Sequence, residues 1–434
     1  MQTNLPHFIE VGQLQIGMYV HLDLGWMDHP FSVSNFKLKD EEQISKIKKI
    51  GLKKLRYDPK RSDCEPLPVS TAEPITVNAA KTESNDTTSP PKKVEVKAIV
   101  PRTERLVQLN HAINENEKKF VVASNVARQV THNILTEPQA SIEQANLLVN
   151  DMVDTALMEG DVAIHALNGN CSSDANYQHS LNVTVLSLMM AKSIEMSKED
   201  FRLLGMAAIF HDIGKAEIAN TVLMKKELLT KAELLHQEQH CEIGARMAQE
   251  VGLPVRVGKI ILQHHEHADG TGYPKRLTAD HTDPLAKLIS LANGFDNLCN
   301  TINPALARSP YEALAYMYAN QRSRFDETLL KHLIRTLGIY PPGSIVHLST
   351  GAYAIVISAN PNKPLRPYVM LHDPKVDRET PTILDLREEP NINISNCVRA
   401  NQLPPDVLSY LNPRKKISYF LDKTLLNDEN APNS

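Results

Sequence analysis

The chain has 434 residues and a mass of 48.5 kDa, enough for two or three domains, and 42% of its residues are hydrophobic, enough to build a core. Its net charge of −4 gives no electrostatic basis for binding DNA, RNA or an anionic membrane over a whole face. No run approaches the roughly 18 to 20 apolar residues of a membrane helix, and the N-terminus lacks the pattern of a secretory signal. The five cysteines are scattered and form no CxxC, which excludes a disulfide scaffold and a cysteine zinc ribbon and favours a cytoplasmic location.

A small α+β module is expected first, over about 5–61. Strand-like alternation at 8–11 and 18–22 is followed by a helical pattern and a final short strand within 40–57. Residues 62–101 hold six prolines, many Ser and Thr and no aromatic residue. Such a composition buries too little apolar surface to offset the entropy of ordering, so this segment is predicted to be a flexible linker.

The rest of the chain predicts a mainly α-helical domain followed by a small β-rich module. Apolar residues repeat with a helical period over 103–340, and Leu181–Met190 is apolar nearly all round, as expected of a helix buried on most sides. Short strand patterns separated by Asn, Pro and Gly then occupy 343–411. Residues 412–434 are interpreted as a tail.

Histidines are concentrated in the helical region, since eight of the 17 fall between residues 179 and 281. His211 and Asp212 come directly after an apolar helical run, and Lys215 follows one helical turn later. An imidazole beside a carboxylate is a good ligand pair for Zn, Mn or Fe, and the lysine could hold a phosphate oxygen. The alternative is a helix end whose charged residues are merely solvated.

A second pair, His264-His265, ends another apolar run and precedes a loop with two Gly and a Pro, Asp269 to Pro274. The backbone of such a loop can approach a phosphate or a base closely. Adjacent histidines point in different directions and could reach two metals, although a histidine at a helix end can also simply cap carbonyl groups.

His236 and His240 are four residues apart, as in the zinc-protease helix H-E-x-x-H. Gln237 stands in place of the catalytic Glu, so that interpretation is rejected. His240 remains a candidate ligand, whereas His236 is interpreted as structural.

Taken in order, these residues resemble the HD-GYP proteins, a branch of the HD phosphohydrolase superfamily, over about 175–335. The N-terminal piece also resembles a module often found before HD-GYP domains. The matching residues are His179, the run His211-Asp212-Ile213-Gly214-Lys215, Glu233, His240, Gly244, the run His264-His265-Glu266, the run Asp269-Gly270-Thr271-Gly272-Tyr273-Pro274, and a late helix that ends near Asp296.

The resemblance implies an all-helical core with bridged metal ions, often iron or manganese, that hydrolyses cyclic di-GMP to pGpG or GMP. It places one metal on His179, His211 and Asp212, and a second on Asp212, His240, His264 and His265. Lys215 would face the scissile phosphate. The loop residues Asp269, Gly270, Gly272, Tyr273 and Pro274, together with Asp296, would contribute to the nucleotide pocket or to a partner surface.

Three positions depart from the family pattern. Ala175 replaces a Glu that would bind a third metal, so a site with two divalent ions is expected. Asn293 replaces a metal-binding Asp, so it is expected to contact a metal through its amide oxygen, but it removes one negative charge, which should weaken metal affinity. The segment 301–305 lacks the basic and tyrosine residues that grip phosphate, and Arg308 is the nearest substitute.

Three functions remain open at this stage. The first is a cyclic di-GMP phosphodiesterase, slowed by Asn293. The second is a degenerate domain that binds nucleotide or a protein partner without turnover, a diguanylate cyclase (GGDEF) protein being one such partner. The third is an HD hydrolase that acts on another nucleotide or phosphate ester. None of the three involves DNA, RNA or membrane insertion.

Overall fold

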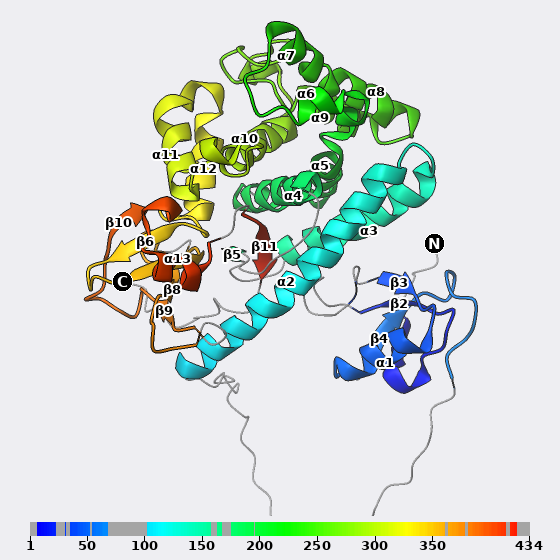
Figure 1. Ribbon diagram of the computed structural model, residues 1–434. Helices are drawn as coiled ribbons and strands as arrows, with labels where there is room; N and C mark the ends of the chain where they lie inside the picture. The colour runs from blue at the N-terminus through cyan, green and yellow to red at the C-terminus, as the bar shows by residue number, and fades with distance from the viewer. Residues whose placement is uncertain are drawn as a thin grey trace, which may run out of the picture. The chain divides into compact units, whose positions relative to one another are not determined.

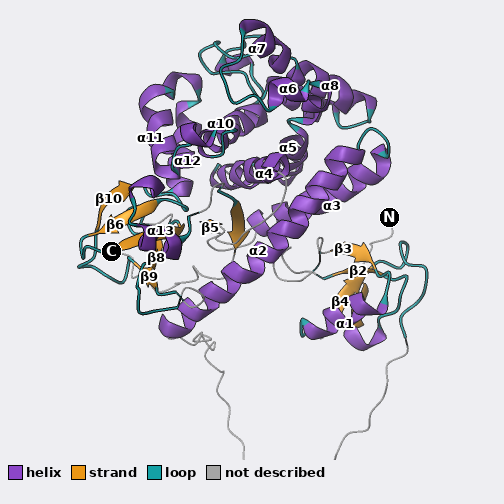
Figure 2. Ribbon diagram, viewed as in Figure 1, coloured by secondary structure: helices purple, strands orange, loops and turns teal. Residues whose placement is uncertain are grey.

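The computed structural model describes residues 7–22, 31, 35–52, 54–67, 102–157, 163–166, 175–194, 196–360, 363–377, 381–413 and 417–422. These residues divide into two compact units, of which the second holds most of the chain from residue 106 onward. The mainly α fold with small sheets near each end agrees with the expectation from sequence (Figures 1 and 2). Of the described helices, none has the length and hydropathy needed to cross a membrane.

The first unit is a four-stranded antiparallel sheet with one helix. The strand order is β1-β4-β2-β3, and α1 begins at its N-cap Asp40, whose carboxylate accepts a hydrogen bond from the Gln43 amide. The element bounds are β1 His7–Glu10, β2 Tyr19–His21, β3 Asn35–Lys37, α1 Glu41–Lys49 and β4 Lys54–Tyr57.

The unit continues past the boundary expected at residue 61. The Leu67 amide donates to the Gln13 carbonyl, and Lys37 pairs with Asp63 at 2.8 Å, so residues 62–67 pack on the module. These contacts join residues far apart in the chain and leave no local sequence signal. The remaining linker residues, 68–101, lie outside the described residues.

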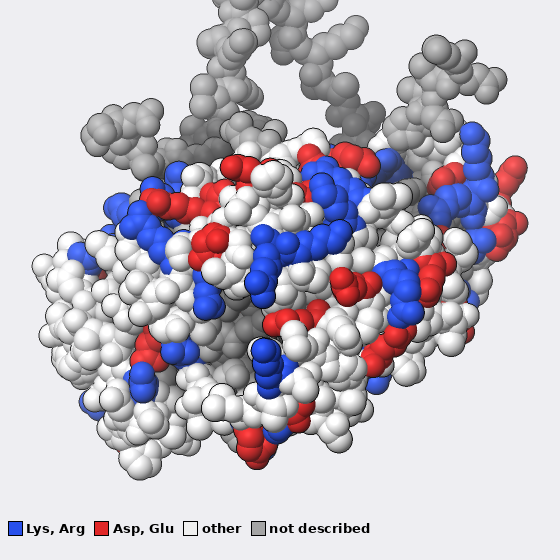
Figure 3. Space-filling view, turned by 90° about the horizontal axis from the view of Figure 1, so that it is seen from above, with Lys and Arg blue, Asp and Glu red and all other residues white. Residues whose placement is uncertain are grey.

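The second unit is built around α4, which is buried along its length. Every residue from Leu181 to Ala191 is buried, as the apolar run predicts, and α5, α10, α12 and α3 all pack against it. The helices are α2 Arg102–Asn133, α3 Pro138–Leu157, α4 Ala175–Ser193, α5 Lys198–Phe210, α6 Asn220–Leu223, α7 Lys231–Glu238, α8 His240–Glu250, α9 Val255–Gln263, α10 Pro284–Cys299, α11 Pro310–Asn320 and α12 Glu327–Leu337. Figure 3 looks onto the side where α6, α7 and α8 lie and shows a hollow with Lys and Arg side chains on its border.

The C-terminal β-rich region forms an antiparallel sheet that also recruits strands from outside it. The order is β10-β6-β7-β5-β11, and in addition β8 pairs with β7 and β9 pairs with β8. The bounds are β5 Ala163–Ala166, β6 Ile345–Leu348, β7 Tyr353–Ser358, β8 Tyr368–Leu371, β9 Ile383–Asp385, β10 Ile394–Val398, α13 Pro405–Leu411 and β11 Tyr419–Asp422. Strand β5 precedes α4, and β11 lies in the segment interpreted from sequence as a tail, so that interpretation does not hold for residues 419–422. Four-residue strands whose partners lie more than 200 residues away carry too little pattern to be read locally.

Candidate metal centre

Helix ends bring the six predicted ligands together inside the second unit. His211 directly follows α5 and Asp212 comes next, His240 is the first residue of α8, and His264 and His265 directly follow α9. His179 lies on α4 and completes the set. These residues form two groups that share Asp212. Within each group, one possible ligand atom from every residue lies within 4.8 Å of those of the others. The groups are Asp212, His240, His264 and His265, and His179, His211 and Asp212.

Three of the histidines are held in one orientation by the helix that ends just before them. The Nδ1 atoms of His211, His240 and His264 lie 2.7, 2.7 and 2.6 Å from the backbone carbonyl three residues earlier. A carbonyl can only accept a hydrogen bond, so each Nδ1 carries the hydrogen, and in the neutral ring Nε2 is left as a bare lone pair. The sequence analysis treated helix capping and metal binding as alternatives. Each of these rings can do both, because Nδ1 caps the helix and Nε2 is left to bind a metal.

The fourth histidine is oriented by a side chain instead. His179 Nδ1 lies 2.6 Å from Asp296 Oδ2 on α10, and Asp296 is fully buried. Histidine ligands in metal sites commonly donate their second ring nitrogen to a carboxylate in this way. The structure thus favours an orienting role for Asp296 over the substrate contact expected for it.

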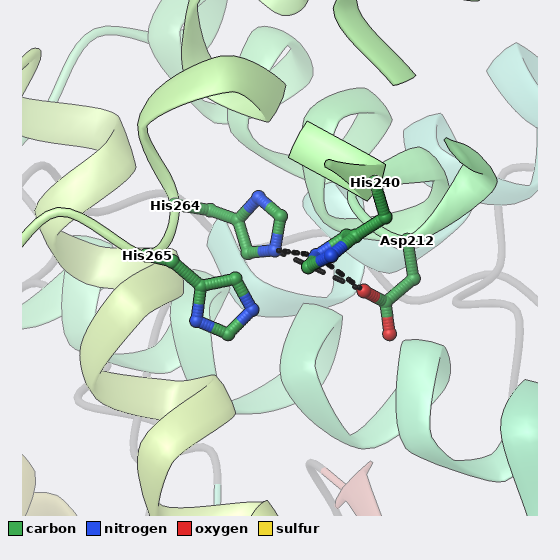
Figure 4. A group of neighbouring side chains, drawn as sticks. All are labelled: Asp212, His240, His264 and His265. Carbon is green, nitrogen blue, oxygen red and sulfur yellow. Dashed lines mark hydrogen bonds and ion pairs between the residues drawn. The ribbon is translucent and has the colours of Figure 1, made fainter. Parts of the chain in front are cut away.

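The two oxygens of Asp212 face the two groups of histidines. Oδ1 lies 3.5 Å from His240 Nε2 and 3.8 Å from His264 Nε2. Oδ2 lies 3.3 Å from His211 Nε2 and 3.7 Å from His179 Nε2. Figure 4 shows the first of these arrangements, with His240 and His264 directed toward each other and the Asp212 carboxylate beside them. A carboxylate placed in this way can bridge two cations.

These residues fit a metal. Asp212 Oδ1 is buried and accepts no hydrogen bond from the described residues, which is costly for a carboxylate oxygen. Nε2 atoms also face each other at 3.3 Å, both between His179 and His211 and between His240 and His264. Opposed lone pairs beside an unsatisfied carboxylate are stabilised by a cation, so the His/Asp cluster can bind metal.

Protonation states in the cluster also suit metal binding. Burial lowers the pKa of His240, and it holds the pKa values of His264 and His265 well below their usual range, so these rings are neutral at pH 7. Burial alone would raise the pKa of Asp212, but the neighbouring His211 ring and Lys215 ammonium group outweigh it and hold that pKa well below its usual range. Ligands that are already deprotonated bind metal without first losing a proton.

Lys215 and Gly214 place the Asp212 carboxylate. The ammonium nitrogen of Lys215 lies 2.5 Å from Asp212 Oδ2, and its side chain keeps about a third of its surface exposed. Gly214 packs directly on the start of α8, where an added Cβ would come within 2.1 Å of the His240 carbonyl oxygen and 2.5 Å of the Gly244 nitrogen. Only glycine permits this approach, which brings Asp212 beside His240.

The loop over 269–274 lies against the second histidine pair. The Tyr273 ring stacks on His265 with centroids 4.6 Å apart, and burial raises the pKa of Tyr273, so its hydroxyl stays protonated. Gly272 approaches the backbone so closely that an added Cβ would lie 2.3 Å from the His267 nitrogen. The structure therefore places Tyr273 against His265, a predicted metal ligand, and Gly272 against the backbone beside it.

Asp269 serves the loop itself. Its carboxylate accepts hydrogen bonds from the amide and hydroxyl of Thr271 and from the Ser323 hydroxyl. Gly270 adopts a positive φ of 74° at the turn, and Pro274 follows Tyr273 at the end of the loop. The contacts of Asp269 are thus structural in the described residues, and its expected role in substrate binding stays a prediction.

Glu266 is a residue whose role the sequence reasoning missed. It is buried, and its carboxylate accepts hydrogen bonds from the Lys275 and Leu277 amides at 2.7 and 2.8 Å. Glu266 thereby ties the loop to the histidine pair. The signal for it was its place directly after His265, at the end of an apolar helix where a charged residue needs a partner.

Two of the three positions that depart from the family pattern lie on or after α10. Asn293 is buried one turn before Asp296, and its side-chain oxygen accepts a hydrogen bond from Asn297. Arg308 lies over the Tyr316 ring at 4.0 Å, so its guanidinium is already in contact with α11. The side chain of Ala175 lies outside the described residues.

Family models match three parts of this chain. Residues 7–145 match a domain of unknown function (DUF3391), residues 162–329 match the HD domain, and residues 345–404 match the KOW domain associated with HD domain. The chain contains an HD domain. The predicted histidine and aspartate ligands all lie within it, and the resemblance drawn from the motifs is confirmed.

Relatives with assigned activities resemble this HD-domain protein over different lengths. The cyclic di-GMP phosphodiesterase PA4108 of Pseudomonas aeruginosa is 25% identical over 83% of this chain and 84% of its own length. The cyclic di-GMP phosphodiesterase response regulator RpfG of Xanthomonas campestris is 34% identical over 34% of this chain and 39% of its own. The 3'3'-cGAMP-specific phosphodiesterase 3 of Vibrio cholerae is 27% identical over 55% of this chain and 50% of its own.

Proposed function

We propose that this protein is a metal-dependent phosphodiesterase that hydrolyses cyclic di-GMP to pGpG or GMP at a site with two divalent cations, iron or manganese. The observation that carries the proposal is the Asp212 carboxylate, whose two oxygens face two sets of histidine Nε2 atoms. The printed activities of PA4108 and RpfG support cyclic di-GMP as the substrate. The proposed metal ligands are those of the two groups that share Asp212.

Hydrolysis forms a new P–O bond from a water oxygen and breaks the P–O bond to the sugar, whose oxygen leaves with a proton. When bound, a pair of divalent cations lowers the pKa of water and stabilises negative charge on phosphoryl oxygens. The chain holds the site in place through the carbonyls that fix His211, His240 and His264, so little reorganisation is needed.

Lys215 supplies a positive charge directly beside the cluster, and its partly exposed side chain can also reach substrate. Its ammonium group neutralises Asp212 Oδ2 at 2.5 Å, and the exposed part of its side chain can contact a non-bridging phosphate oxygen. Tyr273 presents a protonated hydroxyl and a ring beside His265, which suits a guanine base or its ribose. In this proposal Lys215 is catalytic and the loop over 269–274 lines the nucleotide pocket.

A second candidate is a domain that binds a cyclic dinucleotide or a protein partner, such as a GGDEF protein, without turnover. The buried amide of Asn293 in place of a carboxylate supports it, because this position adds no negative charge to the centre. The cGAMP-specific relative also raises 3'3'-cGAMP as an alternative substrate.

One experiment separates these functions. The protein is purified without oxygen from iron-replete and manganese-replete cells, its metal content is measured, and cyclic di-GMP and 3'3'-cGAMP are offered in parallel with product analysis. We expect about two metal ions per chain and hydrolysis of cyclic di-GMP. A metal-loaded protein that binds cyclic di-GMP without product would support the binding module, and a protein without metal in either preparation would contradict the proposal.

The charge at residue 293 gives a further prediction. Because Asn293 lies one turn before Asp296 on α10, Asn293→Asp is expected to add a negative charge near the centre and to raise metal affinity, with faster hydrolysis in an active protein. Metal titration of the apo form with a fluorescent competitor measures the change. Asn320→Asp, an exposed position at the end of α11 that belongs to neither ligand group, is the control and should change affinity little. An unchanged affinity in Asn293→Asp would place residue 293 out of reach of the metals.

A further inference from the structure

The segment 417–422 returns from the C-terminal sheet to the helices that carry the metal centre. Strand β11 pairs antiparallel with β5, which lies just before α4, with Tyr419 opposite Ala166 and Asp422 opposite Ala163. Tyr419 is fully buried, and its ring lies 6.3 Å from that of Phe295 on α10. The segment thus sits between the helix of His179 and the helix of Asp296.

Two asparagines connect this segment to Asp296. The Ile417 carbonyl accepts hydrogen bonds from Nδ2 of Asn182 and Nδ2 of Asn300, at 2.8 and 2.9 Å. The Ile417 amide donates to Asn300 Oδ1 at 2.7 Å, and the Tyr419 amide donates to Asn182 Oδ1 at 3.0 Å. Backbone amides can only donate, so these contacts fix which end of each side-chain amide is oxygen.

The same two Nδ2 groups also bind the carboxylate that orients His179. Asn182 and Asn300 donate to Asp296 Oδ1 at 2.7 and 2.8 Å, while Asp296 Oδ2 takes the contact with His179 at 2.6 Å. Each Nδ2 has two hydrogens, and each uses one for Ile417 and one for Asp296. With the segment in place, all four Nδ2 hydrogens of the two asparagines are therefore bonded.

We propose that the segment 417–419 is a positioning element for the metal centre, acting through Asn182, Asn300 and Asp296 on His179. Removing the segment breaks four hydrogen bonds to the two asparagines and opens a buried carboxylate to rearrangement. His179 then loses its fixed orientation, while His240, His264 and His265 keep theirs. This inference rests on the proposed metal centre. It means that metal binding to the His179 half, the group of His179, His211 and Asp212, depends on the docking of the C-terminal strand.

Truncation tests the proposal in the otherwise complete chain. A chain that ends at residue 416 is compared with one that ends at residue 422, which keeps the segment and is the matched control. We expect the shorter chain to bind the metal of the His179 half roughly 10- to 100-fold more weakly, the usual cost of losing an outer-shell partner, and to keep the other metal. Metal content under limiting metal should fall toward one ion per chain only in the shorter chain.

A point substitution guards against a folding defect in the shorter chain. Asn300 is only partly buried, so Asn300→Ala should fold and should weaken the same metal by about tenfold. Tyr419→Phe removes a hydroxyl that has no hydrogen-bond partner among the described residues and leaves the backbone contacts intact, so metal binding should not change.

Hydrogen exchange of the metal-free protein separates this inference from the proposed function. Loss of the segment should raise exchange in α4 around residues 179–183 and in α10 around residues 295–300, whether or not the wild-type chain holds metal. A wild-type chain without metal would contradict the proposed centre and leave this exchange result to decide the positioning role. Equal metal affinity and equal exchange in the two truncated chains would overturn the inference.

Discussion

Asp212→Asn is expected to remove both metals and to abolish hydrolysis, because one carboxylate serves both halves of the centre. The amide keeps the size of the side chain but offers one neutral oxygen where two charged oxygens face the two sets of histidines. We expect the rate of cyclic di-GMP hydrolysis to fall at least about 1,000-fold, which corresponds to roughly 4 kcal/mol of transition-state stabilisation. Metal content and initial rates, measured on the same preparation, check both parts of the expectation.

His236→Ala is the matched control for this substitution. His236 lies on α7 close to the centre in sequence, yet its ring contacts Gln239 and it belongs to neither ligand group. Its loss should leave metal content and rate within about twofold of wild type, since surface substitutions outside such clusters have small effects. Two metal ions retained by Asp212→Asn would mean that the histidines alone hold the centre and that Asp212 is no bridge.

Gly214→Ala is expected to disrupt both the fold and the centre. The new methyl group would lie 2.1 Å from the His240 carbonyl oxygen and 2.5 Å from the Gly244 nitrogen, and these backbone atoms cannot move aside as a flexible side chain can. Overpacking of this kind costs about 3 kcal/mol, or a fall in Tm of roughly 6 to 12 °C in a domain of this size. Because the shift separates Asp212 from His240, metal affinity should fall as well.

Gly258→Ala provides the comparison for the added methyl group. Gly258 lies within α9, and an added Cβ would have its nearest contact at 3.6 Å from the Ala245 carbonyl oxygen, an ordinary van der Waals distance. This substitution should stabilise the protein by about 0.5 to 1 kcal/mol, because alanine loses less backbone entropy in a helix than glycine. Thermal unfolding of the metal-free forms measures both variants, and an unchanged Tm for Gly214→Ala would refute the close packing of residue 214 on α8.

Several of the predicted ligands could be singled out from sequence because they occur where strong patterns end. Apolar helical runs stop at His211 and at His264, and a charged or polar residue at the end of a buried helix has few roles open to it. The helical period likewise indicated the helical region over 103–340, and turn residues marked the β-rich region over 343–411. These features are local, so a single sequence can show them.

The parts that sequence could not give depend on distant contacts. Asp296 lies 117 residues from His179, and Ile417 lies 235 residues from Asn182, so no spacing or period links them. The contact of Asp296 with His179 was not predicted for this reason, because on a helical wheel its carboxylate can face substrate or a neighbouring helix equally well. Glycine spacing also gave no hint that Gly214 touches α8 through space.

The histidine rings of the centre differ in how easily a mutation can change their orientation. For His211, His240 and His264 the partner of Nδ1 is a main-chain carbonyl, which no amino-acid substitution can delete. For His179 the partner is the side chain of Asp296, which can be exchanged by a single codon change. Substitution of one distant carboxylate can therefore change the orientation of His179, whereas no single substitution can remove the hydrogen-bond partners that orient His211, His240 and His264.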